Sequence, residues 1–117
     1  MKQFLAVFLG SPSSPSHAKW DALDAKTKQE KINLGKAAWH NWVQENKKFI
    51  VYIGGPLGRT KKIDKSGIHE IKNMLAAYTV MQGESYEEVA KLFLNHPHYS
   101  IFPGDSVEIM EVLSIPV

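Results

Sequence analysis

One stretch, residues 39–58, constrains the fold more than any other, because it changes from helical to extended character within a short distance. Its sequence is WHNWVQENKKFIVYIGGPLG. A helix that runs into this stretch gathers its apolar residues within an arc of about 100°; they are Ile32, Gly35, Trp39, Trp42 and Val43. The next run, Phe49–Ile53, is apolar at every position, which is typical of a strand covered on both faces. The stretch therefore predicts a helix that packs on a sheet through one face and leads directly into a buried strand.

The other predicted strands are also apolar runs bounded by turn residues. With the strand of the central stretch they are Gln3–Leu9, Phe49–Gly54, Met74–Met81 and Val107–Leu113. Gln3–Leu9 follows a lysine and precedes a small-residue segment, as in a secretory signal, but its apolar part is at the short limit for one. We therefore favour a strand there. No run approaches the length of about 20 apolar residues that a membrane span needs.

The predicted helices are marked by capping residues. They are a short helix around His17–Leu23, a long helix from Ala25 to about Lys48 with Asp24 as its N-cap, and a helix that opens at the capping box Ser85–Glu88 and ends at Pro97. The segment from Arg59 to Glu70 is polar and basic with a turn signal at Asp64–Gly67, and His98–Asp105 is a predicted loop. The order βαββαβ predicts an α+β, ferredoxin-like antiparallel sheet with both main helices on one face, in a single domain spanning residues 1–117.

The strands raise a problem of coverage, since the first three are apolar toward both faces. Two helices cover only one face of a four-stranded sheet. Leaving about 600 Å² of apolar surface bare on the other face would cost about 15 kcal/mol, more than the stability margin of a domain. The sequence therefore predicts a homodimer formed through the sheet faces.

Composition excludes several other partners. The formal net charge is only +2, although residues 1–72 carry 13 Lys and Arg against 6 Asp and Glu, and residues 73–117 carry 1 against 6. The two halves of the chain interleave in a βαββαβ fold, so positive and negative charges share one surface. Met74–Met81 also lacks the glycine and paired aromatics of an RNA-binding strand. No nucleic-acid partner is therefore expected. The absence of cysteine excludes disulfides and thiolate ligands and favours the cytoplasm.

Three segments together resemble the YCII-related family, also called the DGPF-domain family. They are the WxxWV helix end with the apolar strand into GGPLG, the HPH segment, and PGDSVEIMEVL; the matching positions are Trp39, Trp42, Gly55, Pro56, His96, Pro97 and Val107–Val112. The resemblance implies a dimeric α+β barrel made by stacking two ferredoxin-like sheets, and lyase or isomerase-like chemistry on small cyclic compounds. The name-giving tetrapeptide is missing, since the chain reads DKSGIHE at Asp64–Glu70, and His40 does not fall at the histidine position of relatives, which corresponds to about Gly35.

Histidine is the first place to look for acid–base chemistry, because its unperturbed pKa lies near neutrality. We single out His98, His17 and His69 as candidate proton-exchange groups, with a surface position as the alternative for the last two. His96 and His98 also fit a helix C-terminus, where histidine complements the dipole, and His40 falls at the solvent edge of the long helix. Only the spaced pair in His96-Pro97-His98 resembles a metal motif, so neither a metal nor a cofactor is expected.

The glycine-rich loop after the second strand is the candidate binding element. Gly54–Gly58 is not a phosphate-binding loop, because no Gly-Lys-Ser/Thr follows it. It is either a turn leaving an edge strand or a pocket rim, with Gly55 and Pro56 at the rim and Arg59 as a fixed cation for an anionic ligand. Trp39 is a core residue or a pocket wall, as are Trp20 and Trp42.

Two function classes follow. The first is a small cofactorless enzyme of the lyase or isomerase type, acting on a small cyclic or anionic compound with one histidine as proton shuttle and Arg59 as anion anchor. The alternative is a non-catalytic dimeric module that binds a small molecule or serves as a subunit. A cavity lined by two histidines together with Arg59 would favour the enzyme. We expect the loops after the first and second strands and before the fourth to bring His17, Arg59 and His98 to one cavity mouth.

Overall fold

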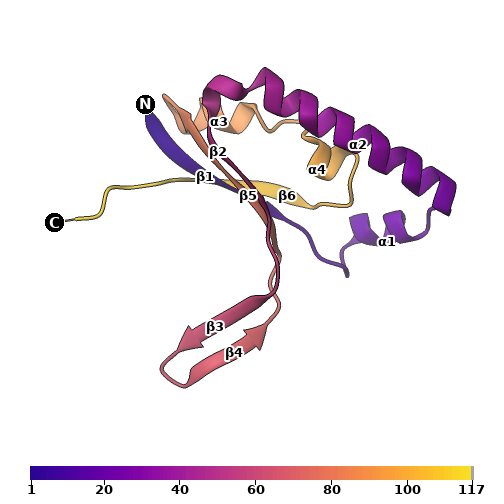
Figure 1. Ribbon diagram of the computed structural model, residues 1–117, viewed down its shortest axis with the longest axis horizontal. Coiled ribbons are helices and arrows are strands. Elements are labelled where there is room, and N and C mark those ends of the chain that lie inside the picture. Colours follow the sequence, from indigo (N-terminus) through magenta and orange to yellow (C-terminus); the bar gives the residue numbers. More distant parts are fainter. Residues whose placement is uncertain (117) are drawn as a thin grey trace.

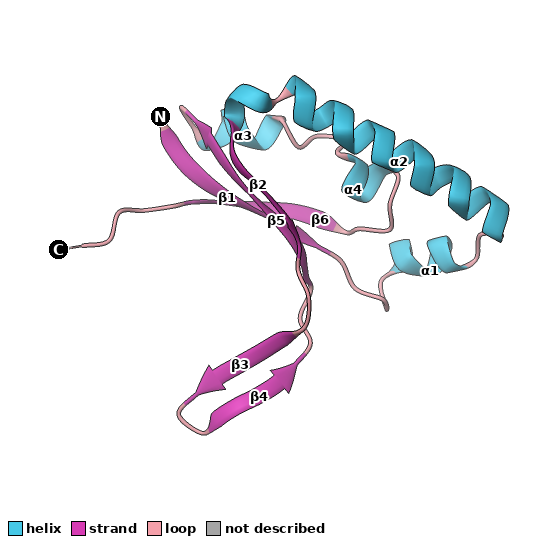
Figure 2. Cartoon of the chain, in the orientation of Figure 1, coloured by secondary structure: helices cyan, strands magenta, loops and turns pink. Residues whose placement is uncertain are grey.

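The computed structural model describes residues 1–116 and shows a four-stranded antiparallel sheet whose helices all lie on one face (Figures 1 and 2). The sheet order is β2-β5-β1-β6, which is the ferredoxin-like arrangement. Its strands are β1 Lys2–Leu9, β2 Ile50–Pro56, β5 Leu75–Gly83 and β6 Ser106–Glu111. All neighbouring strands are antiparallel. The α+β class, the antiparallel sheet and the order of its four strands along the chain agree with the sequence prediction, whereas two further strands between β2 and β5 were not predicted.

The helices and a separate hairpin complete the described chain. The helices are α1 Pro15–Asp21, α2 Ala25–Glu45, the one-turn η1 Lys47–Phe49, α3 Tyr86–Lys91 and α4 Pro97–Ser100. Strands β3 Thr60–Asp64 and β4 Gly67–Ile71 form a second, two-stranded sheet. It projects from the lower end of β2 and β5, on the side of the sheet away from α2 (Figure 1).

Capping side chains fix the starts of the helices where the sequence placed them. The Asp24 carboxylate accepts the Thr27 N–H at 2.7 Å, and this bond lowers the pKa of Asp24. The Ser85 hydroxyl accepts the Glu88 N–H at 3.2 Å. The reciprocal half of the capping box differs from the expectation, since the Glu88 carboxylate accepts the N–H of Glu84 instead of that of Ser85.

Three predicted boundaries are wrong. The long helix ends at Glu45, because Asn46 begins a tighter one-turn segment. The helix that opens at Ser85 ends at Lys91, and Pro97 opens a new helix that runs into the predicted loop. Proline suits the first turn of a helix, where its missing N–H has no partner to lose, and the His96 side chain caps that turn. His96 therefore lies at a helix N-terminus, not at a C-terminus.

Strand β2 contains irregularities that turn its side chains. Its register against β5 shifts on both sides of Tyr52, so that Ile50 pairs with Met81 but Tyr52 pairs with the adjacent Val80. The bulge therefore sends Tyr52 to the face opposite Ile50. Gly54 has φ +66°, and a Cβ at this position would collide with the Tyr78 carbonyl, so only glycine fits.

The core lies between the sheet and the helices. Phe4, Phe8 and Met81 are at most 1% exposed, and they pack with Trp42 and Phe93 from the helical layer. The buried Trp42 indole donates its Nε1–H to the Leu92 carbonyl at 2.7 Å. The apolar stripe predicted for the long helix therefore faces the core as expected, and His40 is exposed.

The opposite face of the sheet carries no helix (Figure 2). Pairing places on it the apolar side chains of Leu5, Val7, Tyr52, Tyr78, Val80 and Met110, together with the polar Gln3, Gln82 and Glu108. We call this set the open face. Tyr52 is 58% exposed and Met110 42% exposed. No helix within residues 1–116 combines the length and apolar character that crossing a bilayer requires.

Candidate functional site

A groove of about 800 Å³ lies where the loop after β1 meets the base of the β3–β4 hairpin. We call it the Arg59 groove. Two cations, Arg59 and Lys72, line it together with Pro12, Gly58, Thr60, Glu70, Ile71, Asn73 and Leu75. Neither cation forms an ion pair with any other side chain of residues 1–116, whereas Glu70 pairs with Lys61 at 3.2 Å. The groove therefore offers positive charge beside an apolar lining.

Asn73 fixes the base of the hairpin that forms this groove. Its side-chain amide donates to the Thr60 hydroxyl at 3.0 Å and accepts the Leu75 N–H at 3.0 Å. The Leu57 N–H donates to the Ala76 carbonyl at 2.9 Å, so the strand ends on both sides of the hairpin are held together. These bonds connect the segment that carries Arg59 to the segment that carries Lys72.

A second cluster of titratable side chains lies inside the core. His96 is 1% exposed, and its ring is surrounded by the rings of Trp39 at 4.5 Å, Trp42 at 4.7 Å and Phe8 at 5.1 Å between centroids. Its Nδ1 accepts the backbone N–H of His98 at 3.0 Å, which places the ring proton of neutral His96 on Nε2. That Nε2 is buried without a hydrogen-bond partner among the described residues.

Burial controls the ionisation of both histidines. Burial, followed by the charge of His98, lowers the pKa of His96 from 6.5 to about 3. Burial also lowers the pKa of His98, while the Leu9 carbonyl, Asp105 and Ser106 oppose that shift. His96 is therefore neutral near pH 7.

His98, which the sequence suggested as a proton-exchange group, lies in the core. It is 8% exposed, and its Nε2–H donates to the Leu9 carbonyl at 2.8 Å. Gly104 packs against this ring so closely that any Cβ at position 104 would collide with it. His98 thus connects α4 to the end of β1.

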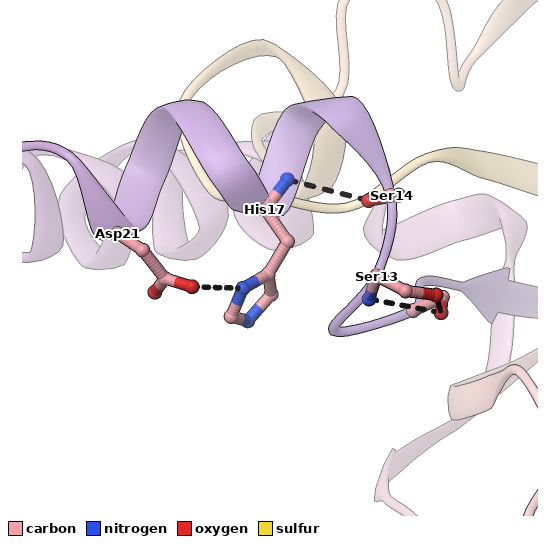
Figure 3. A network of polar contacts seen from close by, with 5 residues as sticks. Ser13, Ser14, His17 and Asp21 are labelled. Atoms are coloured by element: carbon pink, nitrogen blue, oxygen red, sulfur yellow. Dashed lines mark hydrogen bonds and ion pairs between the residues drawn. The ribbon is translucent and has the colours of Figure 1, made fainter.

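His17 lies on the surface of α1. Its Nδ1 is 3.0 Å from the Asp21 carboxylate, and its backbone N–H donates to the Ser14 hydroxyl at 3.3 Å (Figure 3). The pair lies one helical turn apart on a short helix. The contact explains the orientation of the His17 ring.

His69 lies on β4, in the projecting hairpin. Its Nε2 is 2.7 Å from the Ser66 hydroxyl and 3.3 Å from the Asp64 carboxylate. Hydrogen bonds from Ser66 to Asp64 lower the pKa of that carboxyl. The three residues close the hairpin turn, on the exposed side of the molecule.

The predicted site residues are therefore distributed over separate parts of the structure. The expected meeting of His17, Arg59 and His98 at one cavity mouth does not occur within the described chain, because the Arg59 groove is lined by none of the three candidate histidines. Trp39 packs in the core cluster with His96 and His98. Gly55 and Pro56 pair with Tyr78 and Ala77 at the end of β2, before the groove begins at Gly58.

Sequence reasoning missed Lys72 and Asn73, which complete the groove. The available signal was the hairpin itself. Once Asp64–Gly67 is read as a two-strand turn, the residues that flank the hairpin, at Arg59 and Lys72, must come together at its base. Among residues 1–116, no group of three or more His, Asp or Glu side chains is arranged to hold a metal ion.

Comparison with known proteins gives the fold. No family model matches the chain, and no curated protein matches its sequence. Among solved structures, it is similar to 5-chloro-2-hydroxyhydroquinone dehydrochlorinase (TftG) from Burkholderia phenoliruptrix AC1100 in complex with 2,5-dihydroxybenzoquinone. The TM-score is 0.52 at 21% identity, over 92% of this chain and 90% of the other. The likeness extends over nearly the whole of both chains and supports the ferredoxin-like α+β fold.

Proposed function

We propose that this protein is a homodimeric α+β barrel of the YCII-related family, and that it binds a small anionic ring compound in the Arg59 groove. The observation that carries the proposal is the groove itself, where two cations without ion-pair partners in residues 1–116 flank the apolar side chains of Ile71 and Leu75. Small-molecule sites combine an apolar lining with a few fixed polar groups. Arg59 supplies a planar cation suited to a carboxylate or an enolate.

The dimer is supported by the surface area of the single chain. Its accessible surface is 8251 Å², against about 6,400 Å² for a compact monomer of this mass. The radius of gyration is 16.2 Å, against about 13 Å for a compact chain of this length. The excess of about 1,800 Å² falls within the roughly 1,000–2,500 Å² per subunit that obligate homodimers bury.

Calorimetric titration with 2,5-dihydroxybenzoquinone tests ligand binding. This acidic hydroxyquinone is anionic near neutral pH and is the compound bound in the similar dehydrochlorinase structure. We expect Arg59→Ala to weaken binding about 10- to 100-fold, the effect of losing a charge-assisted hydrogen bond. Lys36→Ala, which removes an exposed cation from α2, is the matched control and should bind normally. Equal affinity of the Arg59→Ala protein and the wild type would overturn the proposed site.

Catalytic turnover is the second candidate, and the likeness to a dehydrochlorinase is the observation in its favour. A lyase needs a group that exchanges a proton with the bound compound. Of the candidate histidines, His17 and His69 are solvent-accessible and His98 is buried, and none of the three lines the Arg59 groove of this chain. Appearance of hydroxyquinone absorbance from 5-chloro-2-hydroxyhydroquinone, with release of chloride and a proton, catalysed by the wild type would identify an enzyme, and loss of this turnover in His17→Asn or His69→Asn would identify the proton-exchange group. No change in absorbance with the wild type would leave ligand binding as the function.

A further inference from the structure

The β3–β4 hairpin, residues 60–71, is an arm that the rest of its own chain holds only near its base. Nine of its ten strand residues are exposed, the exception being the half-buried Thr60. Ile63 and Ile68 lie directly opposite each other and are 72% and 68% exposed. A two-stranded hairpin is marginally stable by itself in water, and an exposed isoleucine pair adds an apolar surface that needs a cover.

A matching surface lies at the far edge of the main sheet. Strand β6 pairs only with β1 within the described chain, so its outer edge is free. Beside this edge is a groove of about 340 Å³ whose apolar lining includes Phe93, Leu94, Val107 and Ile109. Leu94 is 70% exposed. We call this the β6 groove.

The charges of the two surfaces are opposite. Residues 59–72, which include the arm and its base, hold five Lys and Arg against two Asp and Glu. Asp105 lines the β6 groove and no Lys or Arg does, while Glu108 is exposed on the open-face side of the same strand. Such complementarity steers association and fixes the relative orientation of partners.

The arm of one chain cannot fill the β6 groove of the same chain. The arm leaves the sheet from β2, and β5 and β1 separate β2 from β6, a distance of about 14 Å across the sheet. Figure 1 shows the arm pointing away from the sheet and from α3 and α4. A twofold axis running along the strands, between two stacked sheets, would instead place the β2 edge of one chain over the β6 edge of the other.

We propose that the arm of each subunit docks in the β6 groove of a second copy of this chain, with Ile63 and Ile68 against Leu94 and the arm lysines near Asp105 and Glu108. The contact occurs twice in the dimer and covers the free edge of β6. It also fixes the walls of the Arg59 groove, because Thr60, Glu70 and Ile71 belong to the arm. This inference rests on the homodimer of the proposed function.

Two variants and one control test the contact by sedimentation equilibrium. Ile63→Thr/Ile68→Thr removes the apolar pair while threonine keeps the β-branching that suits a strand. Leu94→Glu places a carboxylate in the β6 groove. Leu34→Thr removes an equally exposed side chain, 61%, from α2. We expect the dimer dissociation constant to rise at least tenfold for the arm variant and for the groove variant, and to stay unchanged for the control.

Mixing the two variants provides the decisive readout. A mixed dimer keeps one intact arm–groove contact, whereas each variant homodimer keeps none, so the equimolar mixture should associate more tightly than either variant alone. Failure of the mixture to do so would overturn the docking proposal, as would unchanged dissociation constants. Titration of the same samples with 2,5-dihydroxybenzoquinone separates the two proposals: if a dimer unaffected by the variants still binds the compound, only the arm contact is wrong.

Discussion

The two faces of the main sheet are made by the same strands yet differ in burial, although Val7 on the open face is also buried. On the helical face, Phe4, Phe8 and Met81 are at most 1% exposed. On the open face, Tyr52 and Met110 are 58% and 42% exposed. The side chains on the two faces are nevertheless similar in apolar character, which is why the strands read as continuous apolar runs instead of alternating ones.

The difference in burial between the two faces shows how much of its apolar surface a single chain can cover. Helices α2 and α3 cover one face, where their N-caps, their aromatic packing and the Trp42–Leu92 hydrogen bond lie within the chain, and the buried His96 Nε2 lacks a partner among the described residues. The open face and the arm remain apolar and uncovered among the described residues. One chain therefore buries its own core but leaves the open face and the arm exposed. A second copy is the simplest partner with surfaces that match them.

The largest effect on stability should come from the helical face of the sheet. Trp42→Ala removes a buried indole and its bond to Leu92, and should lower the free energy of unfolding by about 3–5 kcal/mol. His40→Ala, on the exposed side of the same helix, should change it by no more than about 1 kcal/mol. Urea titration measures both. Equal losses would show that the two sides of α2 do not differ as the structure indicates.

The buried histidines on the helical face should make stability depend on pH. His96 has a pKa of about 3 in the folded protein and 6.5 unfolded, so below pH 6.5 the unfolded chain binds more protons. Its contribution is fully present above pH 6.5 and is lost as the pH falls toward 3, reaching a loss of about 3 kcal/mol at pH 4.5.

The matched variant is His96→Asn, because asparagine caps a helix without titrating. Its unfolding free energy should depend less steeply on pH between 4.5 and 6.5 than that of the wild type. His40→Asn, at an exposed position of α2, is the control variant. Wild-type and His96→Asn slopes that coincide would show that His96 is not held neutral by burial.

The smallest effect on the isolated subunit should come from the open face. Tyr52→Lys replaces an exposed side chain and should change subunit stability by no more than about 0.5 kcal/mol. In the dimer the same lysine would lose its hydration, so we expect the dissociation constant to rise at least tenfold. Leu34→Lys on α2 is the control. An unchanged dissociation constant for Tyr52→Lys would place the interface elsewhere.

Much of the fold could be predicted from the sequence because its signals are local. The apolar run before Gly54, the Asp24 cap and the Ser85 cap each act within a few residues, and each was found where expected. Pro97 was misread because the same residue that stops a helix also suits the first turn of the next one. The strands of the arm were not predicted, because their sequence is rich in lysine and shows no apolar periodicity.

The candidate site was harder to predict because it depends on distant contacts. His98 is buried by its bond to Leu9 and by the close approach of Gly104, and nothing within the HPH segment signals either partner. Lys72 and Arg59 flank the hairpin and meet only because its two strands pair. Residue types therefore suggested the chemistry, whereas long-range pairing decided which groups are accessible.

Light scattering of the purified wild-type protein tests the central claim most directly, namely that a second copy covers the open face. At micromolar concentration we expect one species with twice the chain mass of 13.2 kDa. A monodisperse species of 13.2 kDa under the same conditions would contradict the claim, because the open face and the arm would then be stable in water without a partner.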